Sequence, residues 1–205
     1  MSNDFEILQP SAIHKVWGGT RLAKIKGIEL GPMQEPLGET WEISIHKDGP
    51  SFTSDQTPLS KIITPEQMPY LVKYIDTSDN LSVQVHPGDD FAKKHENSKG
   101  KTECWIILDA KEGEGIYLGF RDGVTKEQFE QGLKNNEDMS KFLQFYPVKT
   151  GDFFYIPAGN IHAIGKDVLL AEVQQNSGIT YRVWDWNRVD ESGNGSQGAL
   201  RNINT

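Results

Sequence analysis

Short segments of alternating apolar and polar residues recur along the 205-residue chain. Successive side chains of a β-strand point to opposite faces, so such alternation indicates strands with one buried face. Turn residues such as Gly, Pro, Asn and Asp separate the segments. Strands are predicted at residues 39–45, 71–75, 81–85, 102–108, 115–120, 152–156, 161–164, 168–173 and 179–184. Many short strands at regular spacing predict an all-β fold, either an antiparallel barrel or a sandwich.

One longer segment has a helical pattern instead. Thr125 has the chemistry of an N-cap, and the apolar residues Phe129 and Leu133 follow at the spacing of one helix face. A helix is therefore predicted over 125–135, with a further turn or two in a small helical insert near 125–145. The insert would lie between two groups of strands.

The segment LSVQVHP, residues 81–87, places polar side chains at alternate positions of a predicted strand. Ser82, Gln84 and His86 are each two residues apart, so all three are expected to point to the same face. The two valines between them would point to the other face, into apolar packing. One face of this strand is thus suited to chemistry rather than to a core.

A second histidine stands in a recognisable motif. Gly151, Pro157, Gly159 and His162 fit the pattern G-x5-P-x-G-x2-H, which resembles the second motif of the cupin superfamily. The usual final Asn of that motif is replaced by Lys166. Pro157 and Gly159 predict a tight turn, after which a returning strand would carry the imidazole of His162 inward.

These positions, together with Glu103 in KTECW, predict a metal site. A Gln oxygen from Gln84, imidazole nitrogens from His86 and His162, and a carboxylate oxygen from Glu103 can all bind a divalent cation. Nitrogen and oxygen ligation without thiolates suits zinc, with manganese, iron and cobalt left open. A single histidine in an apolar strand is usually a packed core residue, but the second histidine favours the metal site.

Composition and charge limit the classes of partner and compartment. The net charge of −8 and the lack of a basic face argue against a nucleic-acid partner but leave room for a small anionic substrate. The single cysteine, Cys104, excludes an intrachain disulfide, fits a reducing compartment, and is expected to be buried and to face away from the metal. No stretch of about 20 apolar residues predicts a transmembrane helix, and the polar start MSNDFEILQ is not a secretory signal. A cytoplasmic protein is predicted, and its oligomeric state is left open.

The motifs together carry a resemblance to a known family. SVQVHP, KTE-x-W, PAG-x-x-HA and YRVWDW, with W-G-G and GETWEIS, resemble the type I mannose-6-phosphate isomerases, most closely the shorter bacterial form. The resemblance extends from about residue 5 to residue 190. It implies a cupin (jelly-roll) antiparallel β-barrel that binds one Zn²⁺ per chain and interconverts mannose 6-phosphate and fructose 6-phosphate. A phosphorylated hexose would then be the partner.

The resemblance also implies a domain organisation. Residues 1–190 would form a single cupin domain, followed by a polar loop or tail over residues 191–205. Short bacterial members usually continue into a second, small β domain. The chain is therefore expected to be a minimal version, a decayed relative or a truncated product.

Site residues can be carried over from the family onto matching positions. The residues that match its zinc ligands are Gln84, His86, Glu103 and His162. Arg182 matches an active-site arginine and Lys101 a pocket lysine. Ser82 and Arg188 fall where the family handles the substrate phosphate, although Arg188 would otherwise be an ordinary solvated loop charge.

The implied reaction needs a base and a positive centre. An aldose–ketose isomerisation through a cis-enediol moves a proton between C1 and C2 of the sugar, and a metal ion can stabilise the developing oxyanion. Arg182 could add to this stabilisation because its guanidinium stays ionised. Glu172, on the strand predicted at 168–173, is a candidate acid or base, or else an ion-pair partner that holds Arg182. Lys101 is the rival proton-transfer group.

By strand alternation, Trp184 shares the face of Arg182 and should lie close to the rim of the pocket. The alternative function is a non-catalytic cupin that binds a sugar or a metal as a sensor or regulatory module. The presence of Lys101, Glu172 and Arg182 together favours the enzyme.

Overall fold

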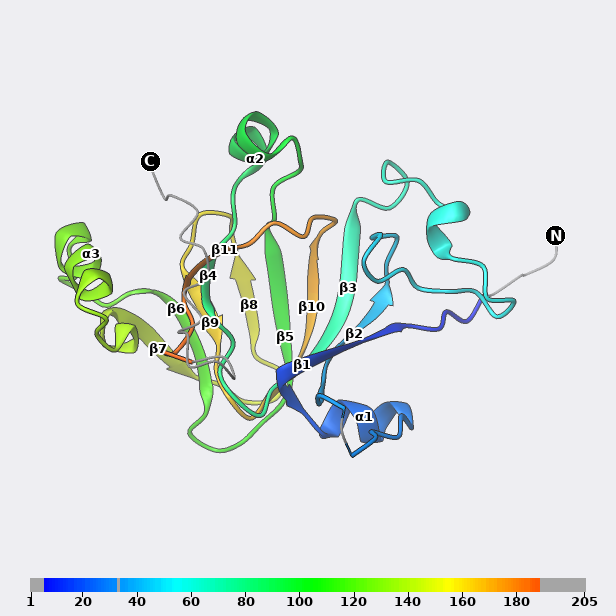
Figure 1. Cartoon of the computed structure of the whole chain (residues 1–205), viewed down its shortest axis with the longest axis horizontal. Helices are drawn as coiled ribbons and strands as arrows, with labels where there is room; N and C mark the ends of the chain where they lie inside the picture. The colour runs from blue at the N-terminus through cyan, green and yellow to red at the C-terminus, as the bar shows by residue number, and fades with distance from the viewer. Residues whose placement is uncertain (1–5, 33, 189–205) are drawn as a thin grey trace.

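The computed structural model describes residues 6–32 and 34–188, so the tail predicted over 191–205 lies outside the described residues. Two antiparallel sheets form the fold (Figure 1). The six-stranded sheet contains, in spatial order, β1 (Ser11–Gly19), β2 (Leu37–Ile43), β3 (Tyr70–Asp76), β10 (Val168–Gln175), β5 (Glu103–Ala110) and β8 (Phe153–Ile156). The five-stranded sheet contains β11 (Tyr181–Trp184), β4 (Val83–Val85), β9 (His162–Ile164), β6 (Gly115–Phe120) and β7 (Leu143–Pro147). The predicted all-β fold is confirmed.

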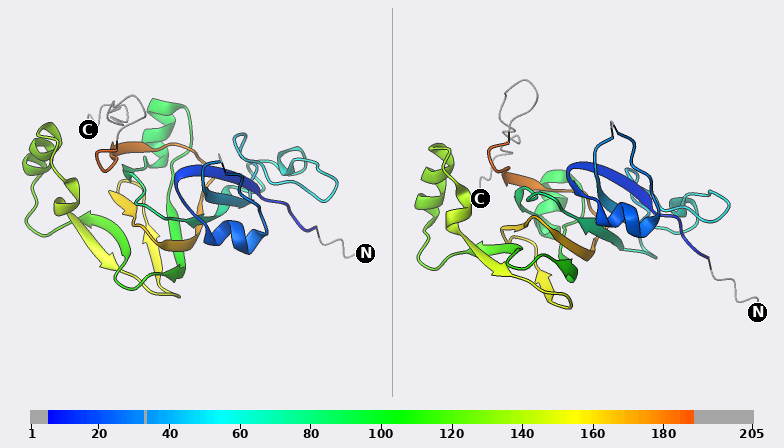
Figure 2. Two further views of the ribbon diagram at one scale, coloured as in Figure 1. Left: turned by 60° about the horizontal axis from the view of Figure 1, so that its bottom comes forward. Right: turned by 90° about the horizontal axis from the view of Figure 1, so that it is seen from below.

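In the part of the chain that the structure describes, helices are few and short. They are α1 (Arg21–Lys26), α2 (Asp89–Glu96) and α3 (Lys126–Lys134), with 3-10 helices η1 (Leu59–Lys61) and η2 (Met139–Phe142). Figure 2 shows α3 at one side of the molecule and α1 beside β1 and β2. Among the described residues, no helix has the length and apolar character needed to cross a membrane.

The predicted helical insert lies between β6 and β7. A full capping box begins α3, because the Thr125 hydroxyl accepts from the Gln128 backbone N–H and the Gln128 side chain accepts from the Thr125 N–H. The prediction near 125–145 included the start of β7, which the structure shows as a strand. Only one of its residues, Leu143, is fully buried, so this edge strand leaves little alternation in the sequence.

The main core fills the space between the two sheets. Ile75, Trp105 and Leu170 from the six-stranded sheet pack with Ile116 and Ile164 from the five-stranded sheet. These residues are inward positions of alternating strands, so burial of their apolar surface holds the sheets face to face. The two sheets can therefore bring together polar side chains that are far apart in sequence.

A second core cluster covers the outer face of the five-stranded sheet. Val83 of β4, Ala163 of β9 and Val183 of β11 pack there with Phe129 of α3 and Met139 of η2. Since Val83 is buried on this outer face, strand alternation directs its neighbour Gln84 toward the space between the sheets. The helical insert thereby fixes which face of β4 is available for a site.

The outer face of the six-stranded sheet is only partly covered. Helix α1 packs on β2 and β3, whereas Ile106, Phe153 and Tyr155 on β5 and β8 are exposed. Cys104 lies on this outer face beside Tyr155, so it faces away from Glu103 as predicted. It is only partly buried, so the predicted burial is wrong, because no helix covers this part of the sheet.

Candidate metal centre and active-site cavity

Three of the predicted metal ligands lie together between the sheets. His86 follows β4, Glu103 begins β5 and His162 begins β9, and one ligand atom of each lies within 4.8 Å of the others. Nε2 of His162 is 3.4 Å from Oε1 of Glu103, and Nε2 of His86 is 3.5 Å from Oε2 of Glu103. All three side chains are buried.

Backbone carbonyls orient both imidazole rings. Nδ1 of His86 donates to the carbonyl of Ile179 at 3.0 Å, and Nδ1 of His162 donates to the carbonyl of Asn160 at 3.0 Å. A proton on Nδ1 leaves the lone pair on Nε2, the atom that each ring turns toward Glu103. Metal-binding histidines usually donate the N–H of their other ring nitrogen to a carbonyl or carboxylate oxygen in this way.

Two atoms of the cluster lack the partners that buried polar groups normally have. Oε1 of Glu103 and Nε2 of His162 are buried with no hydrogen-bond partner among the described residues. Such atoms are rare in folded proteins, because desolvation without a hydrogen bond is costly. A divalent cation bound between them would satisfy both, so the cluster fits a metal ion.

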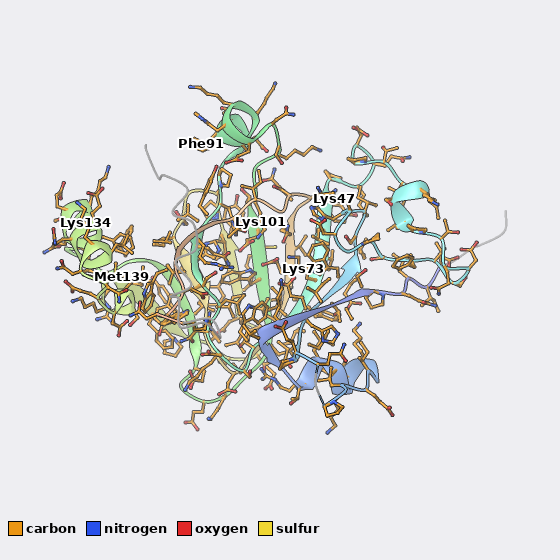
Figure 3. All side chains as sticks on the ribbon, viewed as in Figure 1. Lys47, Lys73, Phe91, Lys101, Lys134 and Met139 are labelled. Atoms are coloured by element: carbon orange, nitrogen blue, oxygen red, sulfur yellow. The ribbon has the colours of Figure 1, made fainter. Side chains whose placement is uncertain are left out.

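The ammonium group of Lys101 borders the same cluster. Its Nζ contacts Oε2 of Glu103 and lies 3.0 Å from Nε2 of His86. A positive group therefore already faces two of the candidate ligand atoms. Figure 3 shows Lys101 and Lys73 near the centre of the molecule, while Lys134 lies on α3 at its side.

Burial sets the protonation of the cluster. It lowers the pKa of His162 to about 4 and, with repulsion from Lys101, lowers the pKa of His86 even further. Both rings are then neutral at pH 7, as metal ligands must be. Burial, reinforced by the negative charge of Glu172, raises the pKa of Glu103 to about 7.

Gln84 lies beside the cluster through its strand pairing. It is the direct cross-strand partner of His162 on β9 and of Arg182 on β11. Directly opposite residues point to the same face with Cβ atoms roughly 5 Å apart. The strand pairing thus places Arg182, Gln84 and His162 in one row on the face that looks toward Glu103.

A cavity of about 420 Å³ lies between the sheets next to this row. The predicted site residues that line it are Ser82, Gln84, Lys101, Glu172 and Arg182.

Arg188 is not among the described residues that line the cavity. Its guanidinium donates hydrogen bonds to Asp79 at 3.0 Å, to Asp185 at 2.5 Å and to the carbonyl of Asn80 at 2.8 Å. A substrate phosphate would have to displace these partners to reach Arg188.

Glu172 is paired with residues other than Arg182. Its Oε1 lies 3.6 Å from Nζ of Lys73, and its Oε2 accepts a hydrogen bond of 2.9 Å from the indole of Trp105. Arg182 instead lies 3.8 Å from Asp185. Burial opposes ionisation of Glu172, but Lys101 and Lys73 outweigh it and hold the pKa of this carboxyl below its usual range.

A buried ion network beside the cavity was not predicted from the sequence. Nζ of Lys73 lies 3.3 Å from Glu39 and 4.6 Å from the centre of the Trp41 ring, and the Trp41 indole donates to Glu39 at 2.6 Å. All three residues line the cavity. The signal was a lysine at an inward position of the apolar segment LVKYI, where a charged side chain needs a buried partner.

The predicted place of Trp184 is wrong, and a β-bulge explains why. Arg182 is opposite Gln84, but Trp184 is opposite Val83, so two steps along β11 correspond to a single step along β4. The bulge turns Trp184 to the face of Val83, where it packs in the second core cluster. Arg182 alone of the two lines the cavity.

Fold and site together define the class of protein. Two facing antiparallel sheets with a buried His/Glu/His cluster between them are the architecture of a cupin with a candidate metal centre. The family model for the catalytic domain of type I phosphomannose isomerase matches residues 6–114. The chain belongs to this family.

Individual relatives agree with this assignment. The mannose-6-phosphate isomerase of Streptococcus mutans is 40% identical over 200 residues, covering 91% of this chain and 62% of the relative. ManA of Bacillus subtilis is 37% identical over 208 residues, covering 94% and 64%. The crystal structure of the mannose 6-phosphate isomerase from Bacillus subtilis superposes with a TM-score of 0.80 at 35% identity, covering 93% and 64%. The chain therefore spans less than two thirds of the length of these relatives.

Proposed function

We propose that this chain is a zinc-dependent aldose–ketose isomerase that interconverts mannose 6-phosphate and fructose 6-phosphate. The observation that carries the proposal is the His86–Glu103–His162 cluster with its two unpartnered ligand atoms, next to a cavity of about 420 Å³. Membership of the phosphomannose isomerase family supports the substrate. A phosphorylated hexose would lie in the cavity with C1 and C2 toward the cluster.

The metal would be held by His86, Glu103 and His162, with Gln84 as the fourth ligand. Nitrogen and oxygen donors of this kind suit zinc, and one ion per chain follows from one cluster among the described residues. One structure of similar fold, with a TM-score of 0.64 and 17% identity, is a mannose 6-phosphate isomerase bound with zinc and yttrium. When bound, zinc supplies a positive charge that polarises the sugar oxygens at C1 and C2.

Residues of the chain would carry out the proton transfer. A base would remove the proton from C2 of mannose 6-phosphate while O1 gains a proton, which gives the cis-enediol. Loss of the O2 proton and return of a proton to C1 then give fructose 6-phosphate. Lys101 is the better-placed group, because it borders both the cavity and the cluster, and it would accept the proton as a neutral amine and return it as an ammonium. Both oxygens of Glu172 are already engaged by Lys73 and Trp105, so Glu172 would act as a second, more constrained acid or base.

Arg182 and Ser82 would hold the two ends of the substrate. Arg182 is opposite Gln84, is about half exposed to solvent and lines the cavity, so its guanidinium would stabilise the enediolate oxygens. Ser82 is two residues before Gln84 on the same face, a distance of about 7 Å along an extended chain. Its hydroxyl would bind the phosphate, which is several bonds beyond C2 in an open-chain hexose.

The alternative, a non-catalytic sugar- or metal-binding module, is not favoured. A binding module needs a shaped and polar cavity but no proton-transfer group. Here Lys101, Glu172 and Arg182, each suited to one part of an isomerisation, all line one cavity. Their convergence from three different strands or loops is better explained by catalysis.

The direct test uses His162→Ala with His95→Ala as the matched control. His162 is buried in the cluster, whereas His95 lies exposed on α2. Zinc content would be measured by elemental analysis and mannose 6-phosphate turnover by a coupled assay. We expect His162→Ala to lose most of its zinc and turnover, and His95→Ala to keep both. Full zinc content in His162→Ala would refute the proposed site.

A further inference from the structure

Among the described residues, four long basic side chains line the cavity, and one of them differs from the others in having no charged partner. Lys73 is paired with Glu39 and Glu172, Lys101 with Glu103, and Arg182 with Asp185. Lys15 also lines the cavity, but its ammonium has no hydrogen-bond or ionic partner among the described residues. In a protein with net charge −8, an unpaired cation in a cavity is a candidate for binding an anion.

The backbone of β2 holds the stem of Lys15 in place. A Cβ atom added to Gly38 would lie 2.7 Å from Cβ of Lys15 and 2.9 Å from the ring of Trp17. Glycine at position 38 therefore lets the aliphatic stem and the indole pack directly on the backbone of β2. Lys15 is half-buried, so part of the entropy that a surface lysine loses on binding is lost already on folding.

The position of Lys15 is close to the segment that leads into Ser82. Two residues beyond Lys15, the carbonyl of Trp17 accepts from the N–H of Ser78 at 2.9 Å, and Trp17 packs against the core cluster that contains Leu81. Lys15 and Ser82 line the same cavity. The Ser82 hydroxyl also has no hydrogen-bond partner among the residues that the structure describes.

This part of the cavity lies away from the candidate metal centre. Lys15 is on β1, at one edge of the six-stranded sheet, and Glu103 is on β5, with β2, β3 and β10 between them. A substrate with its reacting carbons at Glu103 would extend toward β1. The charged end of a hexose 6-phosphate is the end that is remote from C1 and C2.

We infer that Lys15 binds the phosphate group of the sugar phosphate, together with the hydroxyl of Ser82. The inference rests on the proposed function and names a phosphate ligand that the sequence motifs did not indicate. A lysine ammonium offers three donors and a full charge, and such charge-assisted hydrogen bonds are the strong ones. Lys15 is available for this role, whereas two carboxylates already occupy the guanidinium of Arg188.

The test replaces Lys15 by Met, which keeps the stem and removes the charge, and by Arg, which keeps the charge. Lys24→Met is the matched control, because Lys24 is an exposed lysine of α1 outside the cavity. Each zinc-loaded variant would be assayed for kcat and KM with mannose 6-phosphate, for inhibition by inorganic phosphate, and for fructose 6-phosphate binding by calorimetry. Zinc content would confirm that the metal centre is intact.

We expect Lys15→Met to raise KM and the inhibition constant for phosphate by about ten- to a hundredfold, with little change in kcat. Lys15→Arg should restore most of the affinity, and Lys24→Met should resemble the wild type. An unchanged KM in Lys15→Met, or a fall in kcat with KM unchanged, would overturn the inference.

The same data separate this inference from the proposed function. If wild-type protein binds fructose 6-phosphate without turnover, the isomerase proposal fails, and calorimetry of Lys15→Met still decides the role of Lys15. If the wild type turns over its substrate and Lys15→Met has a normal KM, only the inference about Lys15 fails. If the wild type neither binds nor turns over sugar phosphates, both fail.

Discussion

Nζ of Lys101 lies 3.0 Å from Nε2 of His86, the ring nitrogen that faces the candidate metal position. The same ammonium contacts Glu103. The Lys101 ammonium and a bound divalent cation would therefore both lie next to Nε2 of His86 and Oε2 of Glu103, and their positive charges would repel each other. Lys101 also borders the cavity, so the residue proposed for proton transfer is coupled electrostatically to the metal centre.

Lys101→Met separates metal binding from proton transfer. Because the substitution removes a competing positive charge, zinc affinity should stay the same or increase. Loss of the proton-transfer group should lower kcat by about a hundredfold or more. Zinc affinity measured by chelator competition, and kcat by the coupled assay, check both parts. A variant that loses zinc would show that Lys101 supports the cluster, and one with normal kcat would exclude its role in proton transfer.

Zinc affinity should depend on pH through Glu103. Burial raises the pKa of this carboxyl to about 7, so in the zinc-free protein it is protonated below pH 7 and ionised above it. Zinc binds the ionised form, so affinity should fall about tenfold for each pH unit below 7 and level off above it. His162, with a pKa lowered to about 4 by burial, would add to the decline only in stronger acid.

Calorimetry in buffers of different ionisation enthalpy measures the protons released when zinc binds. About one proton per zinc is expected at roughly pH 6, and almost none at roughly pH 8. An affinity that does not change between these two values would contradict the protonation assigned to Glu103.

Two glycines on either side of α2, Gly88 and Gly100, should differ in their tolerance of a methyl group. A Cβ on Gly100 would lie 2.6 Å from the backbone nitrogen of Asp89, whereas a Cβ on Gly88 would meet nothing within 4 Å. Gly100 precedes Lys101, whose backbone N–H donates to the Pro87 carbonyl at 3.0 Å. This hydrogen bond holds together the two ends of the segment that connects His86 to Glu103. Gly100→Ala should cost about 1–3 kcal/mol of stability and weaken zinc binding.

Gly88→Ala is the matched control, and only a small change is expected of it. Thermal unfolding and zinc titration of both variants provide the measurement. Equal behaviour of the two variants would show that close packing of the loop does not set the spacing of the metal ligands.

Local patterns predicted much of the fold but not the details that depend on strand pairing. Alternation located most strands, including β6 at its observed bounds, because their inward residues form the core between the sheets. The bulge in β11 turns Trp184 to the opposite face of the strand, and the neighbouring residue types did not predict a bulge at this position. The edge strand β7 was not predicted because few of its side chains are buried, so its sequence lacks a clear alternation.

The candidate site was predictable from motifs more than from local pattern. His86, Glu103 and His162 come together because β4, β5 and β9 belong to two facing sheets, a long-range arrangement that a single sequence does not show. Strand alternation predicted the inward face of Gln84, which lines the cavity, and its role as a metal ligand stays a prediction. The pairing of Lys73 with Glu39 was missed because these residues are on different strands.

We propose that one zinc ion bound in the His86–Glu103–His162 cluster makes this chain an isomerase. The most direct measurement strips the protein of metal, titrates it with zinc, and follows mannose 6-phosphate turnover by the coupled assay. We expect activity to return in proportion to bound zinc and to reach its plateau at about one zinc per chain. Stoichiometric zinc binding with no turnover, or full turnover before zinc is added, would contradict it.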